Sequence, residues 1–173
     1  MEVFFMREKI KQIWNRIKPY ILPYSVAIAI PLAVGLVSAA LTKGNMDIYG
    51  KLDTPPLSPP GFLFPIVWTV LYILMGISSA MVYIDKDKNL KSAKRGFIYY
   101  LISLVLNFSW SILFFNLQAA LVALVILAVM LYFIIKTVIE YYKVKPIAAY
   151  LQIPYILWVA FAGYLNAGIW LMN

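Results

Sequence analysis

Five long apolar runs occupy most of this chain and restrict it to one class of fold. The run Ala119–Ile135 contains no charged residue, and 64% of the whole chain is hydrophobic. A helix of roughly twenty apolar residues crosses the hydrocarbon core of a bilayer. The sequence therefore predicts an all-α integral membrane protein, folded as a bundle of five transmembrane helices. The predicted spans are residues 21–41, 61–84, 97–115, 119–141 and 147–172.

Basic residues alternate with these spans and give an orientation. They gather before the first span, between the second and third, and between the last two: Arg7, Lys9, Lys11, Arg16 and Lys18; Lys86, Lys88, Lys91, Lys94 and Arg95; Lys143 and Lys145. The opposite side carries only Lys43 and Lys51. Because basic loops stay inside, we expect the N-terminus inside and the C-terminus outside. The same placement accounts for most of the net charge of +8, so we infer no nucleic-acid partner.

Residues 1–19 form a basic extension before the predicted membrane domain of residues 20–173. Apolar and basic residues mix there in a pattern typical of a short amphipathic helix on the inner membrane surface. A frayed basic tail is the alternative. The first apolar segment also resembles a cleaved signal peptide, with Val37-Ser38-Ala39 as the cleavage site. Its apolar run exceeds the usual length of about 7–15 residues, which argues against cleavage.

Three predicted spans carry aromatic and amide side chains on one face. At about 100° per residue, the residues that share these faces are Trp68 and Tyr72 in the second span, Asn107 and Trp110 in the third, and Tyr155, Trp158, Ala162 and Asn166 in the fifth. An amide that faces hydrocarbon without a partner costs several kcal/mol, so Asn107 and Asn166 should point into the bundle. We interpret the three faces as the walls of an aromatic pocket. Interhelical hydrogen bonds and core packing are the alternative.

Such a pocket would be weakly polar and uncharged, which suits flat, conjugated, apolar ligands. The chain contains no cysteine and no histidine. This composition excludes a disulfide framework, a thiol nucleophile, a serine–histidine triad and the usual haem axial ligands, and it predicts no metal site. A ligand would therefore be held by packing and hydrogen bonds. With no carboxylate relay inside the spans, the sequence also argues against an ion-driven pump.

The loop between the first two spans, residues 42–60, differs from the other connections. It contains Pro55, Pro56, Pro59 and Pro60 shortly before the second span. Prolines fix φ and remove donors, so this part of the loop should be a stiff, extended approach to the helix. A stiff loop of this length could cover the mouth of a pocket, and an inert linker is the alternative.

Several short motifs occur in a fixed order along the chain. They are Pro59-Pro60-Gly61 followed by Val67 to Gly76, Leu106 to Ser111 with Phe114-Phe115, Pro154-Tyr155 with Trp158, and Phe161-Ala162 with Leu165-Asn166. In this order they resemble the TspO/MBR family of tryptophan-rich sensory proteins and translocator proteins, also called peripheral-type benzodiazepine receptors. The resemblance covers roughly residues 20–173, and its five spans agree with those predicted here.

The resemblance implies a five-helix bundle, often dimeric, that needs no cofactor. It also implies binding of porphyrins, haem-related tetrapyrroles and synthetic isoquinoline or benzodiazepine ligands in a pocket under the first loop. The positions that match the family's pocket are Tyr49, Trp68, Asn107, Trp110, Trp158 and Ala162. In some bacterial members, tryptophans that match Trp68 and Trp158 are implicated in light-dependent breakdown of protoporphyrin.

Two positions in the first loop depart from the family pattern. Ile48 replaces the tryptophan that precedes the family's tyrosine, and Leu57 stands where an aromatic residue often precedes the Pro-Pro-Gly motif. Both changes weaken the loop contacts expected for a flat ligand. After Tyr164 the chain also lacks the lysine or arginine of the animal members' cholesterol motif. We therefore expect a member of bacterial type, in a bacterial cell membrane.

Three classes of function remain open at this point. The first is a membrane receptor or carrier for tetrapyrroles or other flat hydrophobic ligands, acting as a homodimer in the bilayer. The second is a light-dependent porphyrin-degrading enzyme, although the sequence offers no general base, nucleophile or metal for a conventional mechanism. The third is a structural protein that contacts partners through the small residues of Gly35–Ala39 and Gly76–Ala80.

Overall fold

The computed structural model describes residues 2–173, with the side chains of all of these except residues 2–5, 10 and 46–48. Met1, the first residue of the predicted extension, therefore lies outside the described residues. The elements are α1 (Glu2–Thr42), η1 (Lys43–Lys51), α2 (Leu63–Ile84), η2 (Lys86–Lys88), α3 (Leu90–Ser111), η3 (Ile112–Asn116), α4 (Ala120–Tyr142), α5 (Pro146–Tyr150) and α6 (Ile153–Met172). Within the described residues, five helices are long and apolar enough to span a membrane, which confirms the predicted fold class.

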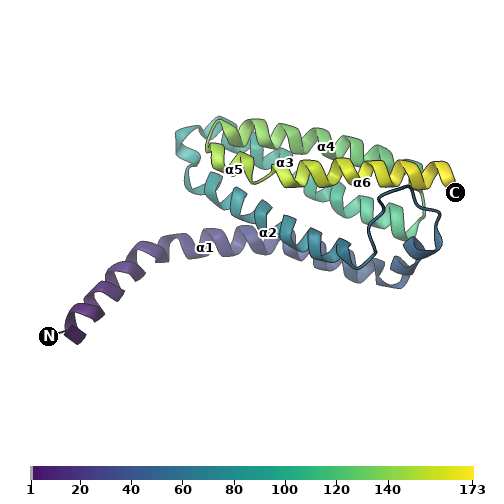
Figure 1. The fold of residues 1–173 in the computed structure, drawn as a ribbon. Helices are drawn as coiled ribbons and strands as arrows, with labels where there is room; N and C mark the ends of the chain where they lie inside the picture. Colours follow the sequence, from purple (N-terminus) through teal and green to yellow (C-terminus); the bar gives the residue numbers. More distant parts are fainter. Residues whose placement is uncertain (1) are drawn as a thin grey trace.

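The long helices lie side by side and form one elongated bundle (Figure 1). The main contacts join α1 to α2, α3 to α4, and α4 to α6. One end of the bundle carries the loop of residues 42–62 and the C-terminus, and we call it the loop end. The other end carries the lysine-containing turns at residues 85–89 and 143–145, and we call it the basic end.

The fifth predicted span consists of two helices instead of one. Residues Leu151 and Gln152 separate α5 from α6, close to Pro154 at the start of α6. A proline has no N–H and its ring clashes with the carbonyl four residues earlier, so a helix cannot pass through this point undisturbed. Hydrogen bonds hold the break against α2: the Gln152 amide donates to Ser78 Oγ at 3.1 Å, and Ser78 Oγ donates to the Ala148 carbonyl at 2.7 Å.

The predicted extension and the first span form a single helix. The helix α1 runs from Glu2 to Thr42 and contains Pro19, Pro23 and Pro31. At 1.5 Å per residue its 41 residues extend about 60 Å, roughly twice the hydrocarbon thickness of a bilayer. Its N-terminal half leaves the bundle and curves away from the other helices (Figure 1). Residue 19 is thus no helix boundary.

Two glycines let α1 and α2 approach closely. A Cβ at Gly35 would overlap the ring of Tyr72, and a Cβ at Gly76 would overlap the backbone of Ile28. Small residues allow this close packing because only van der Waals contact and hydrogen bonds drive helices together in lipid. Two of the small residues that the structural hypothesis assigned to a partner, Gly35 and Gly76, thus pack within the chain, between α1 and α2.

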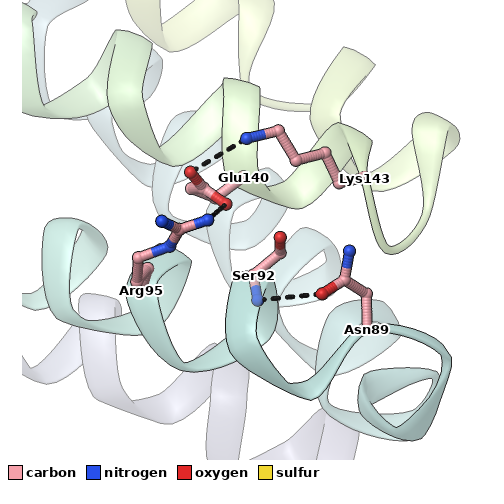
Figure 2. Close-up of polar contacts among 5 residues, drawn as sticks. All are labelled: Asn89, Ser92, Arg95, Glu140 and Lys143. Atoms are coloured by element: carbon pink, nitrogen blue, oxygen red, sulfur yellow. Dashed lines mark hydrogen bonds and ion pairs between the residues drawn. The ribbon is translucent and has the colours of Figure 1, made fainter.

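An ion pair between Arg95 and Glu140 joins α3 to α4 at the basic end (Figure 2). The buried carboxylate of Glu140 accepts hydrogen bonds from Arg95 Nη2 at 3.1 Å and from Lys143 Nζ at 3.0 Å. Nearby, Asn89 caps the start of α3, because its Oδ1 accepts from the backbone N–H of Ser92 at 3.1 Å.

A second carboxylate links two turns of the basic end. The ammonium groups of Lys145 and Lys88 each lie 2.8 Å from Asp85 Oδ2. Hydrogen bonds from Lys145 and then from Lys88 lower the pKa of Asp85, and the bond to Asp85 raises the pKa of Lys145. The turn after α2 is thereby tied to the turn before α5.

Candidate ligand site at the loop end

Trp68 lies at the centre of an aromatic cluster that three helices build. Its ring centroid is 5.6 Å from that of Tyr72, 6.1 Å from that of Trp110 and 6.1 Å from that of Tyr155. Trp68 and Tyr72 are four residues apart and therefore share a face of α2, while Trp110 comes from α3 and Tyr155 from α6. The sequence prediction that these aromatic faces meet inside the bundle agrees with this geometry.

The two amides connect these aromatic residues across helices. Tyr72 Oη donates to Asn107 Oδ1 at 2.8 Å, and Trp110 Nε1 donates to Asn166 Oδ1 at 3.2 Å. Asn166 Nδ2 in turn donates to the Ala120 carbonyl at 2.7 Å. Asn107 Nδ2 is buried and has no hydrogen-bond partner among the described residues. Interhelical bonding, the alternative that the sequence left open, thus accounts for Asn166 fully and for Asn107 in part.

A cavity of about 200 Å³ opens between α1, α2 and the end of α3. Its lining is formed by Leu32, Gly35, Leu36, Ser38, Ala39, Thr42, Phe64, Pro65, Trp68, Thr69, Tyr72, Trp110, Ser111 and Phe115. None of these described lining residues is charged. Of the predicted site residues, Trp68, Tyr72 and Trp110 lie on this wall.

The wall on the α1 side was absent from the sequence prediction. Gly35, Ser38 and Ala39 are small, so they leave space where α1 faces Trp68 and Tyr72. The expected pocket lies between the second, third and fifth spans, where Trp68 packs edge-on against Tyr155 and only a smaller hollow is found. The signal for this wall in the sequence is the small residues of Gly35–Ala39, which the structural hypothesis assigns to a partner.

A π-helical turn, η3, shapes the end of α3 beside this cavity. The Leu117 N–H donates to the Ile112 carbonyl five residues earlier, at 3.1 Å. The wider turn places Phe114 and Phe115 around Trp110, with ring centroids 5.7 and 6.2 Å from it. Such π turns are frequent at functional sites, because they re-aim side chains without ending the helix.

A smaller hollow of about 20 Å³ lies next to the cavity, beneath the loop. It is lined by Tyr49, Phe64, Trp110, Phe114, Phe115, Ala162, Leu165, Asn166 and Ile169. Three predicted site residues, Tyr49, Ala162 and Asn166, therefore meet here. Phe64, Trp110 and Phe115 line both spaces and separate one from the other.

Three predicted residues lie behind these walls. Asn107 and Tyr155 are buried among the helices, and neither lines either space. Trp158 packs edge-on against Phe64 at 5.9 Å, and its buried Nε1 has no hydrogen-bond partner in the described part of the chain. Phe64 therefore lines both spaces and also contacts Trp158. The sequence prediction did not include Phe64 among the site residues.

The loop over this site is fastened to α6. The Asp53 N–H donates to Asn173 Oδ1 at 3.0 Å, while Asn173 Nδ2 donates to the Asp53 carbonyl at 2.9 Å. Tyr164 Oη donates to the Pro56 carbonyl at 2.8 Å, and Pro55 packs where Gly168 has no side chain. The loop begins as the 3-10 helix η1 and then crosses the loop end in extended form (Figure 1).

Tyr49 connects this loop to the hollow beneath it. Its ring packs edge-on against Phe64, with centroids 5.1 Å apart, and its hydroxyl lies 3.4 Å from the Pro59 carbonyl. Asn45 Nδ2 donates to Asn116 Oδ1 at 3.0 Å and links η1 to the end of η3. These contacts favour a cover over an inert linker.

Comparison with known proteins gives one consistent result. The sequence pattern of the TspO/MBR family matches residues 27–171. The tryptophan-rich protein TspO of Chlorobaculum tepidum is 36% identical over 154 residues, which cover 88% of this chain and 97% of the relative. The protein of the same name from Archaeoglobus fulgidus is also 36% identical, over 88% of this chain and 98% of its own. The translocator protein of Bos taurus is 34% identical, over 83% of this chain and 86% of its own.

Proposed function

Because the chain belongs to the TspO/MBR family of membrane proteins, we propose that it is a receptor or carrier for porphyrins, related tetrapyrroles or other flat hydrophobic ligands. The observation that carries the proposal is the cavity beside Trp68, with its aromatic walls and without a charged lining residue among those described. Conjugated rings stack on such walls, and a low density of polar groups suits an apolar ligand.

The cavity must enlarge before it can hold a tetrapyrrole. Pockets for drug-sized ligands occupy roughly 300–1,000 Å³, so a space of about 200 Å³ is too small for a tetrapyrrole. Rotation of Phe64 would join the cavity to the hollow of about 20 Å³ under Tyr49. Because the two spaces together stay below that range, a tetrapyrrole would also require the loop above them to open. The rotation of Phe64 would expose Trp158 Nε1, a buried donor that could then bind a ligand carbonyl or carboxylate.

Orientation and assembly complete the proposal. We place the basic end inside and the loop end outside a bacterial cell membrane, because cytoplasmic loops carry the excess of lysine and arginine. The loop end would then meet ligands from the outer side. The homodimer that the family resemblance implies stays a prediction.

A porphyrin titration tests the proposed function. Protoporphyrin added to the purified protein should quench its tryptophan fluorescence in a saturable way, because Trp68 and Trp110 line the cavity. The double variant Trp68→Phe with Trp158→Phe should lose the part of this saturable quenching that comes from Trp68 and keep the part that comes from Trp110. As a matched control, Trp170→Phe removes an exposed tryptophan outside the cavity and should leave the binding curve unchanged. Absent quenching, or equal quenching in the double variant, would refute the site.

Light-dependent porphyrin breakdown is a second candidate, favoured by one observation. Trp68 lines the cavity, and its ring lies within 6.1 Å of three other aromatic rings, an arrangement that can pass an electron to or from an excited ligand. The oxidant in this reaction would be molecular oxygen. Illumination in air should then convert bound porphyrin to a new spectral product in the wild type and not in Trp68→Phe. Equal conversion by both proteins would exclude this activity.

A further inference from the structure

The N-terminal part of α1 is a surface that the proposed function does not use. We call residues 6–20 the N-terminal arm; it projects from the basic end (Figure 1). Since α1 extends about 60 Å and a bilayer's hydrocarbon core only about 30 Å, the arm lies beyond the hydrocarbon. Its apolar side chains are nonetheless exposed: Trp14 by 53% and Ile17 by 49%.

The arm is amphipathic, and basic residues flank its apolar face. At 100° per residue, Met6, Ile13, Ile17 and Tyr20 fall within one narrow sector, with Trp14 and Ile21 at its edge. The basic residues lie on both borders of this sector: Arg7, Lys11 and Lys18 on one side, Lys9 and Arg16 on the other. Gln12 and Asn15 occupy the opposite face. Lysine and arginine in these border positions can rest their stems on the apolar zone and extend their charges to phosphates.

Two prolines determine the direction in which the arm bends. Pro19 and Pro23 are four residues apart and share one face of α1. Each ring presses on the carbonyl four residues earlier, which opens the helix on the proline side and bends it toward the opposite side. Trp14, Ile17 and Ile21 lie on that opposite side, the concave one. When the arm bends over the membrane surface, these side chains therefore face the lipid.

We propose that the N-terminal arm binds the anionic phospholipid surface at the basic end of the molecule. Its apolar sector enters the boundary between headgroups and acyl chains, and its basic borders contact lipid phosphates. Charge supports this partner: the arm has five basic residues against one acidic residue, Glu8, which already pairs with Lys11 at 3.5 Å. Position supports it too, because the arm continues directly from a membrane-spanning helix and so remains at the surface of the bilayer.

The absence of cysteine from the sequence makes a sharp test possible, since one introduced cysteine is a unique labelling site. An environment-sensitive fluorophore is attached to the full-length protein at Ile17→Cys, on the concave face, or at Gln12→Cys, on the polar face. Both proteins are reconstituted into vesicles of phosphatidylcholine, with or without phosphatidylglycerol. With phosphatidylglycerol, the label at residue 17 should shift its emission to the blue and resist quenching by aqueous iodide. The label at residue 12 should do neither.

Charge variants of the Ile17→Cys protein distinguish binding to anionic phospholipid from apolar insertion that does not depend on the basic residues. Each basic residue near an anionic surface contributes roughly fivefold, so Lys11→Gln with Lys18→Gln should lower the ratio of docked to undocked arm about 30-fold. Lys91→Gln with Lys94→Gln removes the same charge from the exposed start of α3 and should leave the ratio unchanged. Equal behaviour of the two labels, equal loss in the two charge variants, or a blue shift that requires an added acidic protein would overturn the proposal.

Discussion

The two ends of the bundle are held together by different interactions. At the loop end, aromatic rings and neutral hydrogen bonds surround a cavity of about 200 Å³, and a fastened loop crosses above it. At the basic end, the carboxylates of Glu140 and Asp85 each bridge two cations, and the break before α6 is closed by Ser78 and Gln152. The proposed function fits this difference, because ion pairs hold the helices at the basic end, whereas the neutral contacts of the loop end could open for a ligand.

The physical reason lies in what each set of contacts costs when it is opened. A shared, largely buried carboxylate cannot lose its cations without leaving an uncompensated charge, so the basic end resists separation of its helices. Aromatic packing and neutral hydrogen bonds can exchange for similar contacts with a ligand at little cost. The predictions below test this division, in order of decreasing effect.

Glu140→Gln should give the largest loss of stability. The substitution removes the charged acceptor that Arg95 and Lys143 share. Because these two side chains are 44% and 43% exposed and stay solvated, we expect the free energy of unfolding to fall by about 1–2 kcal/mol. Thermal unfolding in detergent measures this loss, and porphyrin affinity should stay unchanged. Lys143→Gln is the control. Glu140 keeps its ion pair with Arg95 in this variant, and the side chain of Lys143 is 43% exposed. The free energy of unfolding should therefore fall by less than about 1 kcal/mol. Similar losses in both variants would contradict the central role of Glu140.

Trp68→Ala should have the largest effect on binding. Because Trp68 lines the cavity, removing its ring should take away about 1.5 kcal/mol of stacking on the ligand, so porphyrin affinity should fall about tenfold. A titration followed by the ligand's own absorbance measures the change without relying on tryptophan emission. Trp170→Ala, at the exposed end of α6, should bind as the wild type does; a matching loss there would indicate a general disturbance of the fold.

Tyr164→Phe should loosen the loop with little effect elsewhere. It deletes the hydroxyl that donates to the Pro56 carbonyl, a contact worth about 1 kcal/mol. Because the loop then opens more often, ligand should enter and leave up to about fivefold faster, as measured by stopped-flow mixing. Tyr83→Phe removes an exposed tyrosine hydroxyl from the other end and should not change these rates. Unaltered exchange in Tyr164→Phe would show that this bond does not restrain the loop.

Acidification should affect the basic end through Asp85. Its pKa is lowered in the folded protein, so its stabilising contribution is present above the pKa of an unfolded aspartate and is lost as pH falls through the folded pKa. At neutral pH the free energy of unfolding of wild type should exceed that of Asp85→Asn by less than about 1 kcal/mol, because the cations are exposed. Below about pH 4 this difference should disappear. Unfolding curves of both proteins between neutral and acidic pH give this difference. A constant difference across that range would exclude Asp85 as its source.

The sequence could predict the spans but not every neighbour of each span. Continuous apolar runs identify a membrane helix without reference to its partners, and the described residues indeed contain five helices long and apolar enough to span a membrane. The choice of which helix faces a cavity depends on packing, and the small residues of α1 beside Trp68 and Tyr72 are visible only once α1 and α2 are paired. The break between α5 and α6 could have been predicted from Pro154.

The sequence predicts that the buried amides have hydrogen-bond partners, but it does not predict which residues these partners are. Burial requires that Asn107 and Asn166 find partners, but sequence does not indicate that these are Tyr72 and Trp110. The long-range pair of Arg95 with Glu140 joins residues 45 positions apart and has no local signal. Phe64 lies four residues before Trp68, on the same face of α2, but only its contacts with Tyr49 and Trp158 in the fold give it a place in the site.

The most direct test of the division between the two ends is the rise in unfolding temperature that saturating protoporphyrin produces. A ligand stabilises a protein in proportion to its affinity for the folded state, so this rise reports binding separately from intrinsic stability. Glu140→Gln should unfold at a lower temperature than wild type yet keep the full rise. Trp68→Ala should also unfold below the wild-type temperature, because its ring packs against three others, but its rise should be clearly smaller than that of wild type. Loss of the rise in Glu140→Gln, or a full rise in Trp68→Ala, would contradict the account.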